Sequence, residues 1–318
     1  MKIGRLRPVM RAWCFRRYGG PEVLSFEELP VPLVAPREIL VKVAAASINP
    51  IDSKLREGKL SWLVSPEFPR VPGRDCAGTA VAIGAGVSDF ALGDLVVGIA
   101  DMQRNGTHAE FAILPAAQVA KIPPAMSAVQ AVAVGVTGLS AYIPLMEIAR
   151  PSPGQRVLVH AGAGGVGSLA VQIARHLGAE VVATCGTANL DYVRSLGAAL
   201  AIDYTVEDFV IAAGRCDVVF DTIGGEVHRR SSTVLRPGGM LVYLTAAPID
   251  AEPPRDDIRI IHAKIRYTRE VLEQVIALIA SGAVVPQVGR IFPLSEAQAA
   301  YAISATGHAR GKIILVTD

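Results

Sequence analysis

The sequence predicts an α/β fold in which a doubly wound parallel sheet is joined to a second, β-rich and discontinuous domain. Short apolar segments separated by Pro and Gly turns fill the chain from Ala12 to about Pro124, whereas strands and helices alternate from about Ala125 to Ala263. At 318 residues with 51% hydrophobic content, the chain is long enough to bury a large core. That length suggests about two domains.

The two segments differ in the strands they predict. The first has short strands bounded by turn residues, which is typical of antiparallel sheets, and we expect them at Glu38–Ala45, Ala77–Ile83, Asp94–Ile99 and Ala109–Leu114. The second has buried-looking strands between helices, which is typical of a parallel sheet. We expect these at Val157–Ala161, Val181–Cys185, Leu200–Tyr204, Val218–Thr222, Met240–Leu244 and Ile258–His262.

The C-terminal segment carries a different pattern. We expect a helix at Arg269–Ser281, a second helix begun by a capping box of Ser295 with Gln298, and a last strand at Lys312–Val316. Because this strand does not extend the parallel series, we expect the tail to return to the first domain. The predicted domains are therefore residues 1–124 and 265–318, which form the β-rich domain, and residues 125–264, which form the parallel sheet.

A glycine-rich turn follows the first strand of the parallel series. Gly162, Gly164 and Gly167 have the G-x-G-x-x-G spacing of a dinucleotide-binding Rossmann fold, in which the backbone approaches a pyrophosphate closely. An amphipathic helix at Ser168–Leu177 and a strand at Glu180–Cys185 complete a βαβ unit. On spacing alone, an ordinary strand-turn-helix connection is the alternative.

The tip of the second strand carries no carboxylate. In NAD-binding folds an Asp or Glu about 20 residues past the glycine motif binds the ribose hydroxyls. This chain has Gly186, Thr187 and Asn189 there, and a neutral loop of hydroxyl and amide groups admits the 2′-phosphate that a carboxylate would repel. The sequence therefore predicts NADPH. Tyr192 and Arg194 are further candidate donors, or ordinary residues of a helix surface.

Composition excludes several classes of partner. A net charge of +2 without basic runs gives no reason to expect nucleic acid or an anionic membrane as a partner. The charge-free stretch Met126–Met146 contains Gly, Pro and polar residues, so we expect a broken, buried helix rather than a membrane span. Single cysteines without C-x-x-C spacing, and no secretory signal, predict a cytoplasmic location.

Motifs along nearly the whole chain follow one another in the order typical of one enzyme family. They are Tyr18–Leu24, Asn49–Gly58, Pro72–Gly78, Phe90–Asp94, Gly138–Tyr142, Ala161–Gly167 and Gly307–Ile313. In these motifs the chain resembles the medium-chain dehydrogenase/reductase superfamily, specifically its zinc-less quinone oxidoreductase (zeta-crystallin-like) branch. The resemblance implies a GroES-like catalytic domain beside the Rossmann domain and a homodimer formed through the Rossmann sheet.

The chain departs from its zinc-dependent relatives at the metal ligands. They place a Cys at or near Asn49 and a Gly-His-Glu at Gly73–Asp75, and their four-cysteine lobe is missing from Ala100–His108. A catalytic zinc needs about three converging protein ligands. We therefore expect no metal, with a site using His108 or His160 as the alternative.

The missing metal favours particular reactions. Alcohol oxidation passes through an alkoxide-like species whose basicity resembles that of hydroxide, with a water pKa of about 16 that zinc lowers to about 7. A quinone that receives a hydride becomes a phenolate, and a phenol has a pKa of about 10, so its charge is easier to carry by about 8 kcal/mol. The enolate from an α,β-unsaturated carbonyl follows the same logic. We therefore expect NADPH-dependent reduction of a quinone, with a 2-alkenal or enone reductase, or a non-catalytic NADPH-binding protein, as alternatives.

The resemblance also implies roles for single residues. The predicted catalytic residues are Asn49 beside the nicotinamide and substrate, Ser140 near the carboxamide, and Lys54, which stands where several quinone reductases have a Tyr. The predicted cofactor contacts are Gly162, Gly164, Gly165, Val166, Gly167, Gly186, Thr187, Asn189, Tyr192, Thr245 and Arg310. Lys54 could polarise a carbonyl or donate a proton, or be a solvated surface cation. An Asx turn at Asn49 and capping hydroxyls at Ser140 and Thr245 are the structural alternatives.

Overall fold

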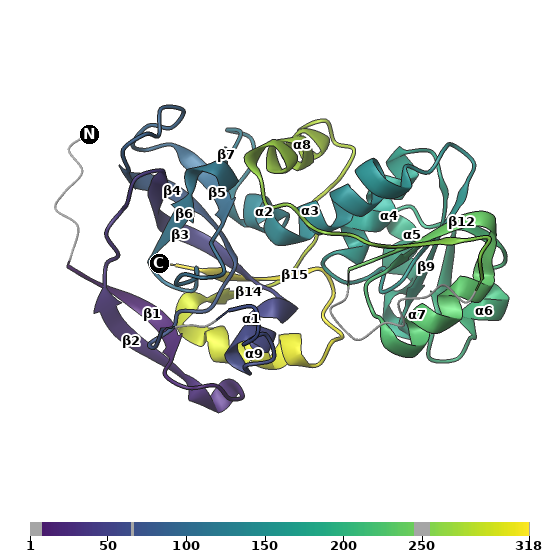
Figure 1. The fold of residues 1–318 in the computed structure, drawn as a ribbon, viewed down its shortest axis with the longest axis horizontal. Coiled ribbons are helices and arrows are strands. Elements are labelled where there is room, and N and C mark those ends of the chain that lie inside the picture. The colour runs from purple at the N-terminus through teal and green to yellow at the C-terminus, as the bar shows by residue number, and fades with distance from the viewer. Residues whose placement is uncertain (1–7, 65–66, 245–254, 318) are drawn as a thin grey trace. The chain divides into compact units, whose positions relative to one another are not determined.

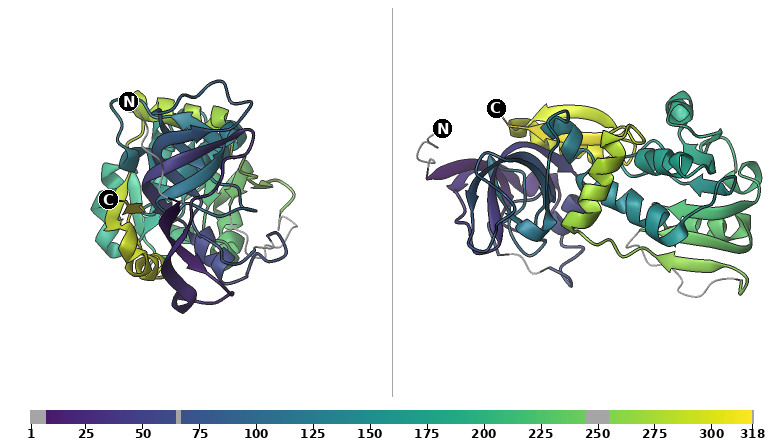
Figure 2. Two further views of the ribbon diagram at one scale, coloured as in Figure 1. Left: turned by 90° about the vertical axis from the view of Figure 1, so that its left-hand side faces the viewer. Right: turned by 90° about the horizontal axis from the view of Figure 1, so that it is seen from above.

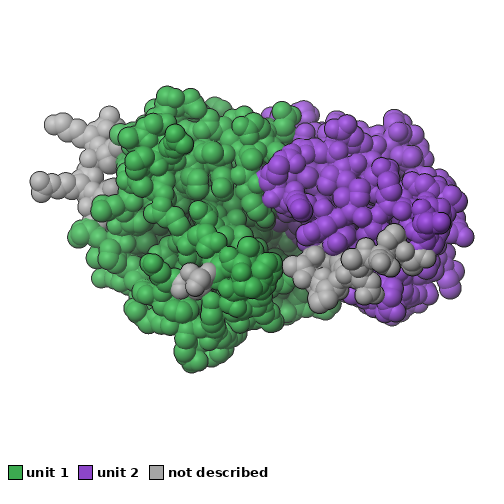
Figure 3. Space-filling view, in the orientation of Figure 1, with its two compact units in different colours: residues 1–136, 267–276, 288–318 green, residues 137–266, 277–287 purple. Residues whose placement is uncertain are grey.

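The structure is a computed structural model, and it describes residues 8–64, 67–244 and 255–317. The chain divides into two compact units, which Figure 3 distinguishes by colour. Unit 1 comprises residues 1–136, 267–276 and 288–318, and unit 2 comprises residues 137–266 and 277–287.

Unit 1 is built on a seven-stranded sheet in the order β14-β15-β3-β4-β5-β7, with β6 paired to β3 (Figure 1). Its strands are β3 (Glu38–Ile48), β4 (Asp75–Ile83), β5 (Leu95–Ile99), β6 (Phe111–Pro115), β7 (Val119–Lys121), β14 (Val288–Pro293) and β15 (Lys312–Val316). All of these pairs are antiparallel except β14 with β15. In β3 the side chains of Val41 and Val43 are buried and Lys42 between them is exposed, as a sheet with one covered face requires.

A two-stranded hairpin completes the β structure of unit 1. Strands β1 (Val9–Phe15) and β2 (Leu24–Pro30) pair with each other in antiparallel register. Trp13 and Phe15 of β1 share one apolar cluster with Tyr301, and the Trp13 indole Nε1 donates to the Leu294 carbonyl at 2.6 Å. The tail of the chain is thereby packed against its beginning.

The helical elements of unit 1 are short. They are η1 (Pro21–Val23), α1 (Pro50–Arg56), η2 (Ala116–Gln118), α2 (Ala128–Val132), η6 (Leu294–Glu296), α9 (Ala297–Ala305) and the first part of α8 (Arg269–Ala280). The predicted capping box at Ser295 is wrong. Ser295 lies inside the 3₁₀ turn η6, whose closing bond runs from Ala297 N to Leu294 O, so Glu296 becomes the N-cap of α9 without a side-chain cap.

Unit 2 contains a six-stranded parallel sheet in the order β10-β9-β8-β11-β12-β13. Its strands are β8 (Arg156–Val159), β9 (Glu180–Cys185), β10 (Leu200–Asp203), β11 (Cys216–Asp221), β12 (Leu235–Tyr243) and β13 (Arg259–His262). Each coincides with a predicted strand, so the doubly wound sheet is confirmed. The order reverses at β8, and the crossovers on the two sides of that strand lie on opposite faces.

Helices cover this sheet on both faces. They are α4 (Gly167–His176), η4 (Thr187–Asn189), α5 (Leu190–Ser195), α6 (Phe209–Ala212), α7 (Gly225–Ser231) and η5 (Ser232–Val234). Helices α4 and α5 lie on one side and α7 on the other (Figure 1 and Figure 2). Because both faces are covered, β8, β9 and β11 are almost continuously buried.

The unit boundaries differ from the predicted domain boundaries in three places, of which one is the short segment 265–266, which belongs to unit 2. Residues 125–136 belong to unit 1, because α2 packs against β3 and β4. Residues 277–287 belong to unit 2, because Gln172 on α4 hydrogen-bonds both the N–H and the carbonyl of Val285, at 2.8 and 3.1 Å. Neither bond could be inferred from the apolar pattern of the tail.

The charge-free stretch forms a broken run of helix, as expected. It contains α2, α3 (Gly135–Tyr142) and a π-helical segment at Ile143–Ala149. Among the described residues, the helices are all too short or too polar to cross a bilayer.

Candidate functional site

The glycine-rich turn of unit 2 connects β8 to α4. A Cβ added at Gly162 would lie 2.8 Å from Ala183 Cβ, and one added at Gly167 would lie 2.0 Å from the Ala161 carbonyl oxygen. Packing within the protein therefore demands glycine at both positions. At Gly164 the nearest atom among the described residues is the Ala161 oxygen, at 3.4 Å, so no described residue fills the space beside it. This space is what the close approach of a pyrophosphate requires.

The start of α4 offers hydrogen-bond donors beside that space. Gly165 and Val166 precede the helix, and within the described part of the chain no acceptor pairs with their backbone N–H groups. The positive end of the helix dipole lies at the same place. The turn therefore fits a dinucleotide, with Gly164, Gly165 and Val166 as the residues that would hold its phosphates.

Hydroxyl groups gather at the tips of β9 and β10. A Cβ added at Gly186 would lie 3.7 Å from the Tyr204 hydroxyl, and the side-chain oxygens of Thr187 and Thr205 are 3.3 Å apart. Sequence reasoning named Gly186 and Thr187 but missed Tyr204 and Thr205. The available signal was their place directly after the predicted strand that pairs with β9.

A carboxylate also lies near this tip, on the neighbouring strand. Asp203 Oδ1 accepts from the backbone N–H and the hydroxyl of Thr205, at 3.0 and 2.6 Å. Hydrogen bonds from Thr187 and Thr205 hold the pKa of Asp203 below its usual value. The Asp203 carboxylate is therefore bound within its own turn, and the tip of β9 presents hydroxyl groups without a carboxylate of its own.

The other predicted cofactor residues are dispersed. Asn189 ends η4, where its N–H donates to the Gly186 carbonyl at 2.9 Å. The Tyr192 hydroxyl donates to Gln287 at 3.1 Å, so its proton is engaged within unit 2. Arg310 is exposed before β15 and belongs to unit 1. Thr245 lies outside the described residues.

Asn49 lies at the centre of a buried polar network in unit 1. It is the N-cap of α1, but its side chain is turned towards the sheet. Its Nδ2 donates to Asp75 Oδ1 at 3.0 Å, and its Oδ1 accepts from Lys312 Nζ at 2.8 Å. Its backbone N–H donates to Asp52 Oδ2 at 2.7 Å. The amide is therefore held in one orientation, with both ends engaged.

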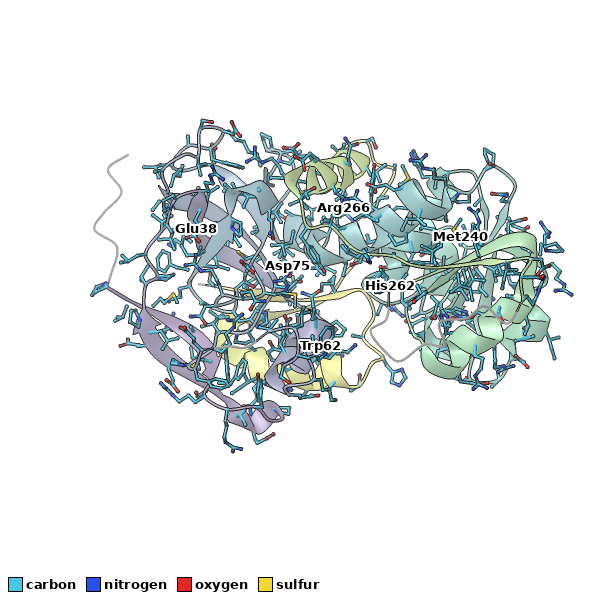
Figure 4. The ribbon with its side chains drawn as sticks, viewed as in Figure 1. Glu38, Trp62, Asp75, Met240, His262 and Arg266 are labelled. Atoms are coloured by element: carbon cyan, nitrogen blue, oxygen red, sulfur yellow. The ribbon has the colours of Figure 1, made fainter. Side chains whose placement is uncertain are left out.

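Asp75, labelled in Figure 4, begins β4 and is fully buried. Its Oδ1 also accepts from the Ser47 hydroxyl at 2.6 Å, and its Oδ2 accepts from the Val136 N–H at 2.8 Å. These bonds and the nearby ammonium of Lys312 compensate the loss of water around the carboxylate.

Two titrating groups of the network are shifted by burial. Burial lowers the pKa of Lys312, against the opposing effect of the Asp75 and Asp52 charges. Burial raises the pKa of Asp52 to about 7, with a further contribution from Asp75 and an opposing one from the Asn49 N–H. Asp52 therefore exchanges its proton near neutral pH, which is the range useful for acid catalysis. Sequence reasoning missed both residues, although each lies inside a quoted motif.

Both buried histidines named as alternative metal ligands are fully hydrogen-bonded. His108 Nε2 lies 3.2 Å from the Ser47 carbonyl, which only accepts, so Nδ1 accepts from the Tyr301 hydroxyl at 2.9 Å. His160 Nε2 and Nδ1 contact Ser231 and Thr184, at 2.9 and 3.1 Å. Burial lowers the pKa of each ring to about 4. Among the described residues no three His, Cys, Asp or Glu side chains converge on a metal-sized site.

The remaining predicted catalytic residues lie on helices. Lys54 is half-buried on α1, one turn from Asn49, and its carbonyl accepts from the Lys59 N–H at 3.0 Å. Ser140 is buried on α3 and belongs to unit 2. The structure thus places Asn49 and Lys54 on one short helical segment. Their predicted roles, and that of Ser140, stay predictions.

Comparisons with known protein families cover both units. A family model for the alcohol dehydrogenase GroES-like domain matches residues 35–124, and one for zinc-binding dehydrogenases matches residues 196–315.

Several curated proteins are similar over nearly the whole chain. An Arabidopsis thaliana protein named NADPH-dependent alkenal/one oxidoreductase, chloroplastic, is 36% identical, over 96% of this chain and 79% of its own. A Solanum lycopersicum 2-methylene-furan-3-one reductase is also 36% identical, with the same coverage. An Arabidopsis thaliana chloroplast envelope quinone oxidoreductase homolog is 31% identical, over 96% of this chain and 98% of its own.

Solved structures share the fold. The quinone oxidoreductase from Coxiella burnetii superposes with a TM-score of 0.89 and 31% identity, over 98% of this chain and 100% of that chain. A mycobacterial protein complexed with NADPH has a TM-score of 0.87 and 30% identity, over 96% of this chain and 99% of that chain.

Proposed function

The chain belongs to the quinone oxidoreductase-like branch of the medium-chain dehydrogenase/reductase family, and from this premise we propose that it transfers a hydride from NADPH to a quinone. When bound, NADPH supplies the hydride. The protein's own residues hold the phosphates at Gly164–Val166, and Asn49, whose amide is fixed by Asp75 and Lys312, is the predicted neighbour of the nicotinamide and the acceptor.

The observation that carries the proposal is the pair of features at the edge of the parallel sheet. Space beside Gly164 admits a pyrophosphate, and the β9 tip next to Tyr204 presents hydroxyl groups where an NAD-binding protein has a carboxylate. Both features fit a dinucleotide that carries a 2′-phosphate. The NADPH dependence stated in the name of a relative supports the same cofactor.

A second acceptor class is favoured by the relatives' names. Two of them act on an alkenal or enone and on a 2-methylene-furan-3-one, and both substrates are α,β-unsaturated carbonyls. Quinones and enones share an electrophilic carbon conjugated to a carbonyl, and each yields a resonance-stabilised oxyanion after hydride transfer. We keep quinone reduction as the proposal and enone reduction as its alternative.

We further propose that the reaction needs no zinc. Asn49 and Arg74 occupy positions where zinc-dependent relatives carry ligands, and amide and guanidinium groups are poor ligands for zinc. Zinc content of the purified protein by elemental analysis tests this directly. One zinc per chain, combined with loss of turnover on chelation, would overturn the proposal.

The acceptor class is tested by steady-state kinetics with NADPH on a matched panel. The panel contains 1,4-benzoquinone, 1,4-naphthoquinone, 2-hexenal and 3-buten-2-one, with hexanal as a saturated control. We expect a kcat/KM for the quinones at least 10-fold above that for the enones. The reverse order establishes the enone reductase, and NADPH binding without oxidation by any acceptor supports a non-catalytic role.

We also propose a cytoplasmic homodimer. The edge strand β13 of the unit 2 sheet has one unpaired side among the described residues, which suits pairing with a second copy. All the cysteines are free and buried, as suits a reducing compartment. Light scattering of the purified chain tests the dimer, and fractionation of the source cells tests the location.

A further inference from the structure

Unit 1 contains a small cavity beside the Asn49 network. Its charged lining residues are Asp52, Arg70, Arg74, Asp101 and Arg104. Its volume is about 20 Å³, and one water-sized group needs roughly 10–15 Å³. The cavity therefore receives a single oxygen-sized group and not a whole ring.

Two buried polar atoms of the lining residues have no partner among the described residues. They are Asp52 Oδ1 and Arg74 Nε. Asp52 is 1% exposed and Arg74 is 3% exposed, so bulk water does not satisfy them. No ion pair joins the two side chains to each other in the described part of the chain. Five buried side-chain atoms of the described residues have no partner, and two of them belong to residues that line this one cavity, which suits a polar occupant.

The other charged groups of the cavity are already engaged. Arg70 donates from Nη1 to the Gln103 carbonyl at 3.0 Å, and Asp101 Oδ1 accepts from the Gln103 N–H at 2.9 Å. Arg104 forms an ion pair with Glu38. The recognition chemistry of the cavity therefore belongs to Asp52 and Arg74.

The geometry points to a subsite for one acceptor oxygen: we propose that the cavity receives the carbonyl oxygen of the substrate, that Arg74 Nε–H donates to it, and that the Asp52 carboxyl delivers the proton that follows the hydride. This inference rests on the proposed function and deepens it by naming the cation that stabilises the oxyanion and the group that donates the proton. Arg74 Nη1 is anchored on the Ala100 carbonyl, which fixes the guanidinium in place.

The step balances as follows for a quinone. The hydride forms a C–H bond at a ring carbon conjugated to one carbonyl group, and the displaced π electrons leave that carbonyl oxygen as an enolate. The O–H bond of the Asp52 carboxyl breaks and an O–H bond forms on that oxygen, which yields the enol and an Asp52 carboxylate. The ring carbon that received the hydride then loses a proton to solvent and the second carbonyl oxygen gains one from solvent, which yields the hydroquinone. Solvent returns the proton to Asp52 before the next turnover. For an enone the same transfer yields the enol, which becomes the saturated carbonyl.

The charges around Asp52 suit this role. Asp75 disfavours its ionisation, whereas Lys312, Arg74 and the Asn49 N–H favour it, and burial outweighs all of them and raises the pKa of Asp52 to about 7. Oδ2 is held by the Asn49 N–H, so the proton is carried on Oδ1, the unpartnered atom. Arg74 then stabilises both the product anion and the carboxylate left behind.

The first experiment measures binding without cofactor or turnover. The probe is 4-nitrophenol, whose absorbance reports both binding and ionisation. We expect Arg74→Met to weaken 4-nitrophenol binding at least 10-fold. Arg74→Lys keeps the charge but lacks the Nε–H group, and we expect it to weaken binding at least 10-fold as well. Asp52→Asn retains a donor at the same place and should bind within about 3-fold of the wild type. Glu28→Gln is the control, because Glu28 is exposed on β2 and does not line the cavity, and it should leave 4-nitrophenol binding unchanged.

The second experiment measures turnover of 1,4-benzoquinone between pH 5.5 and 8.5. Wild-type kcat should fall as the pH rises through about 7, because the donor must be protonated. Asp52→Asn should lose kcat by about 10²-fold or more, typical of a removed general acid, and should lose this pH dependence, with NADPH binding unchanged. A merely structural role would not move the pH profile.

The oxygen subsite, the Asp52 donor and quinone reduction fail in different ways in these experiments. If the wild type reduces quinones and both Arg74 variants bind 4-nitrophenol as tightly as the wild type, the oxygen subsite is wrong and the proposed function stands. Unaltered turnover and pH profile in Asp52→Asn overturn its role as donor alone. If the wild type binds 4-nitrophenol through Arg74 but reduces no acceptor, the oxygen subsite stands. The proposed function and proton delivery by Asp52 are then both wrong.

Discussion

Lys312 Nζ lies 2.8 Å from Asn49 Oδ1, although the two residues are 263 positions apart in the sequence. The contact exists because β15 pairs antiparallel with β3, with Ile313 opposite Ile48. The same ammonium donates to the Ile48 carbonyl at 2.7 Å. The last strand of the chain thus orients the amide of Asn49, and with it the Nδ2 group that faces Asp75.

Replacing Lys312 by Met should destabilise unit 1. The substitution leaves Asn49 Oδ1 and the Ile48 carbonyl, both buried, without their donor. Each unsatisfied acceptor costs about 1–3 kcal/mol, so we expect the free energy of unfolding to fall by roughly 2–6 kcal/mol. Urea denaturation measures it. Lys121→Met is the control, because Lys121 is exposed and its ion pair with Asp94 contributes about 0–1 kcal/mol. Equal losses in both variants would contradict the structural role of Lys312.

Stability should fall towards acid pH because of His108 and His160. In the unfolded chain each ring takes up a proton at its ordinary pKa of 6.5, whereas in the folded chain burial lowers that pKa to about 4. Between these values the folded state binds fewer protons, so lowering the pH favours unfolding. The loss approaches on the order of 3 kcal/mol per ring by pH 4. Asp52, with its raised pKa, acts in the opposite direction over about pH 4–7.

The measurement is the free energy of unfolding of the wild type and of His108→Gln between pH 4.5 and 7. The variant should show a shallower acid-side decline, whatever its stability at pH 7. His308→Gln serves as the control, since His308 is exposed, and it should keep the wild-type slope. An unchanged slope in His108→Gln would mean that the ring is charged in the folded protein.

The fold could be predicted because apolar periodicity and glycine positions are local features of the sequence. Every strand of the parallel sheet could be predicted from a short apolar run. Gly178 predicted the end of α4, because the residue after a helix often has a positive φ that favours glycine, and Gly178 has a φ of 80°. Strands β1, β2, β7 and β14 were not predicted. β2 and β14 are largely exposed and mix polar and apolar residues without a clear period, and β7 has only three residues. Residues 277–287 belong to unit 2 because of single hydrogen bonds from Gln172 to Val285, and no sequence pattern predicts such bonds.

The site was predictable only where backbone conformation dictates the residue. Gly162 and Gly167 are required by contacts within their own turn, and that requirement appears directly as spacing. Lys312 and Asp52 acquire their roles by burial beside Asp75, which depends on the pairing of β15 with β3 and β3 with β4. Long-range register of this kind cannot be read from composition or periodicity.

Two glycines of the same turn should respond differently to alanine. Gly167→Ala places a methyl group 2.0 Å from the Ala161 carbonyl oxygen, so the turn must open, and we expect a loss of several degrees in melting temperature. Gly164→Ala meets only ordinary contact at 3.4 Å, so its melting temperature should stay close to that of the wild type. Its methyl group occupies the space assigned to the pyrophosphate, so NADPH binding should weaken at least 10-fold. Thermal unfolding and NADPH fluorescence titration distinguish the two, and intact NADPH binding in Gly164→Ala would place the dinucleotide elsewhere.

Gly186→Asp should reverse the preference between the two nicotinamide cofactors. A Cβ at this position lies 3.7 Å from the Tyr204 hydroxyl, which is ordinary contact, so the side chain is accommodated without displacing the strand tip. The added carboxylate repels a 2′-phosphate and accepts from ribose hydroxyls. The ratio of the Kd for NADH to that for NADPH should therefore fall by at least 10-fold, measured by fluorescence titration.

Gly186→Asn separates charge from size in this experiment. The amide has nearly the same volume as the carboxylate, so any steric effect on the β9 tip appears in both variants, whereas repulsion of the phosphate appears only in Gly186→Asp. We expect Gly186→Asn to keep the NADPH preference. An equal shift in both variants would assign the effect to crowding beside Tyr204, and no shift in either would show that the 2′-phosphate binds away from the tip of β9.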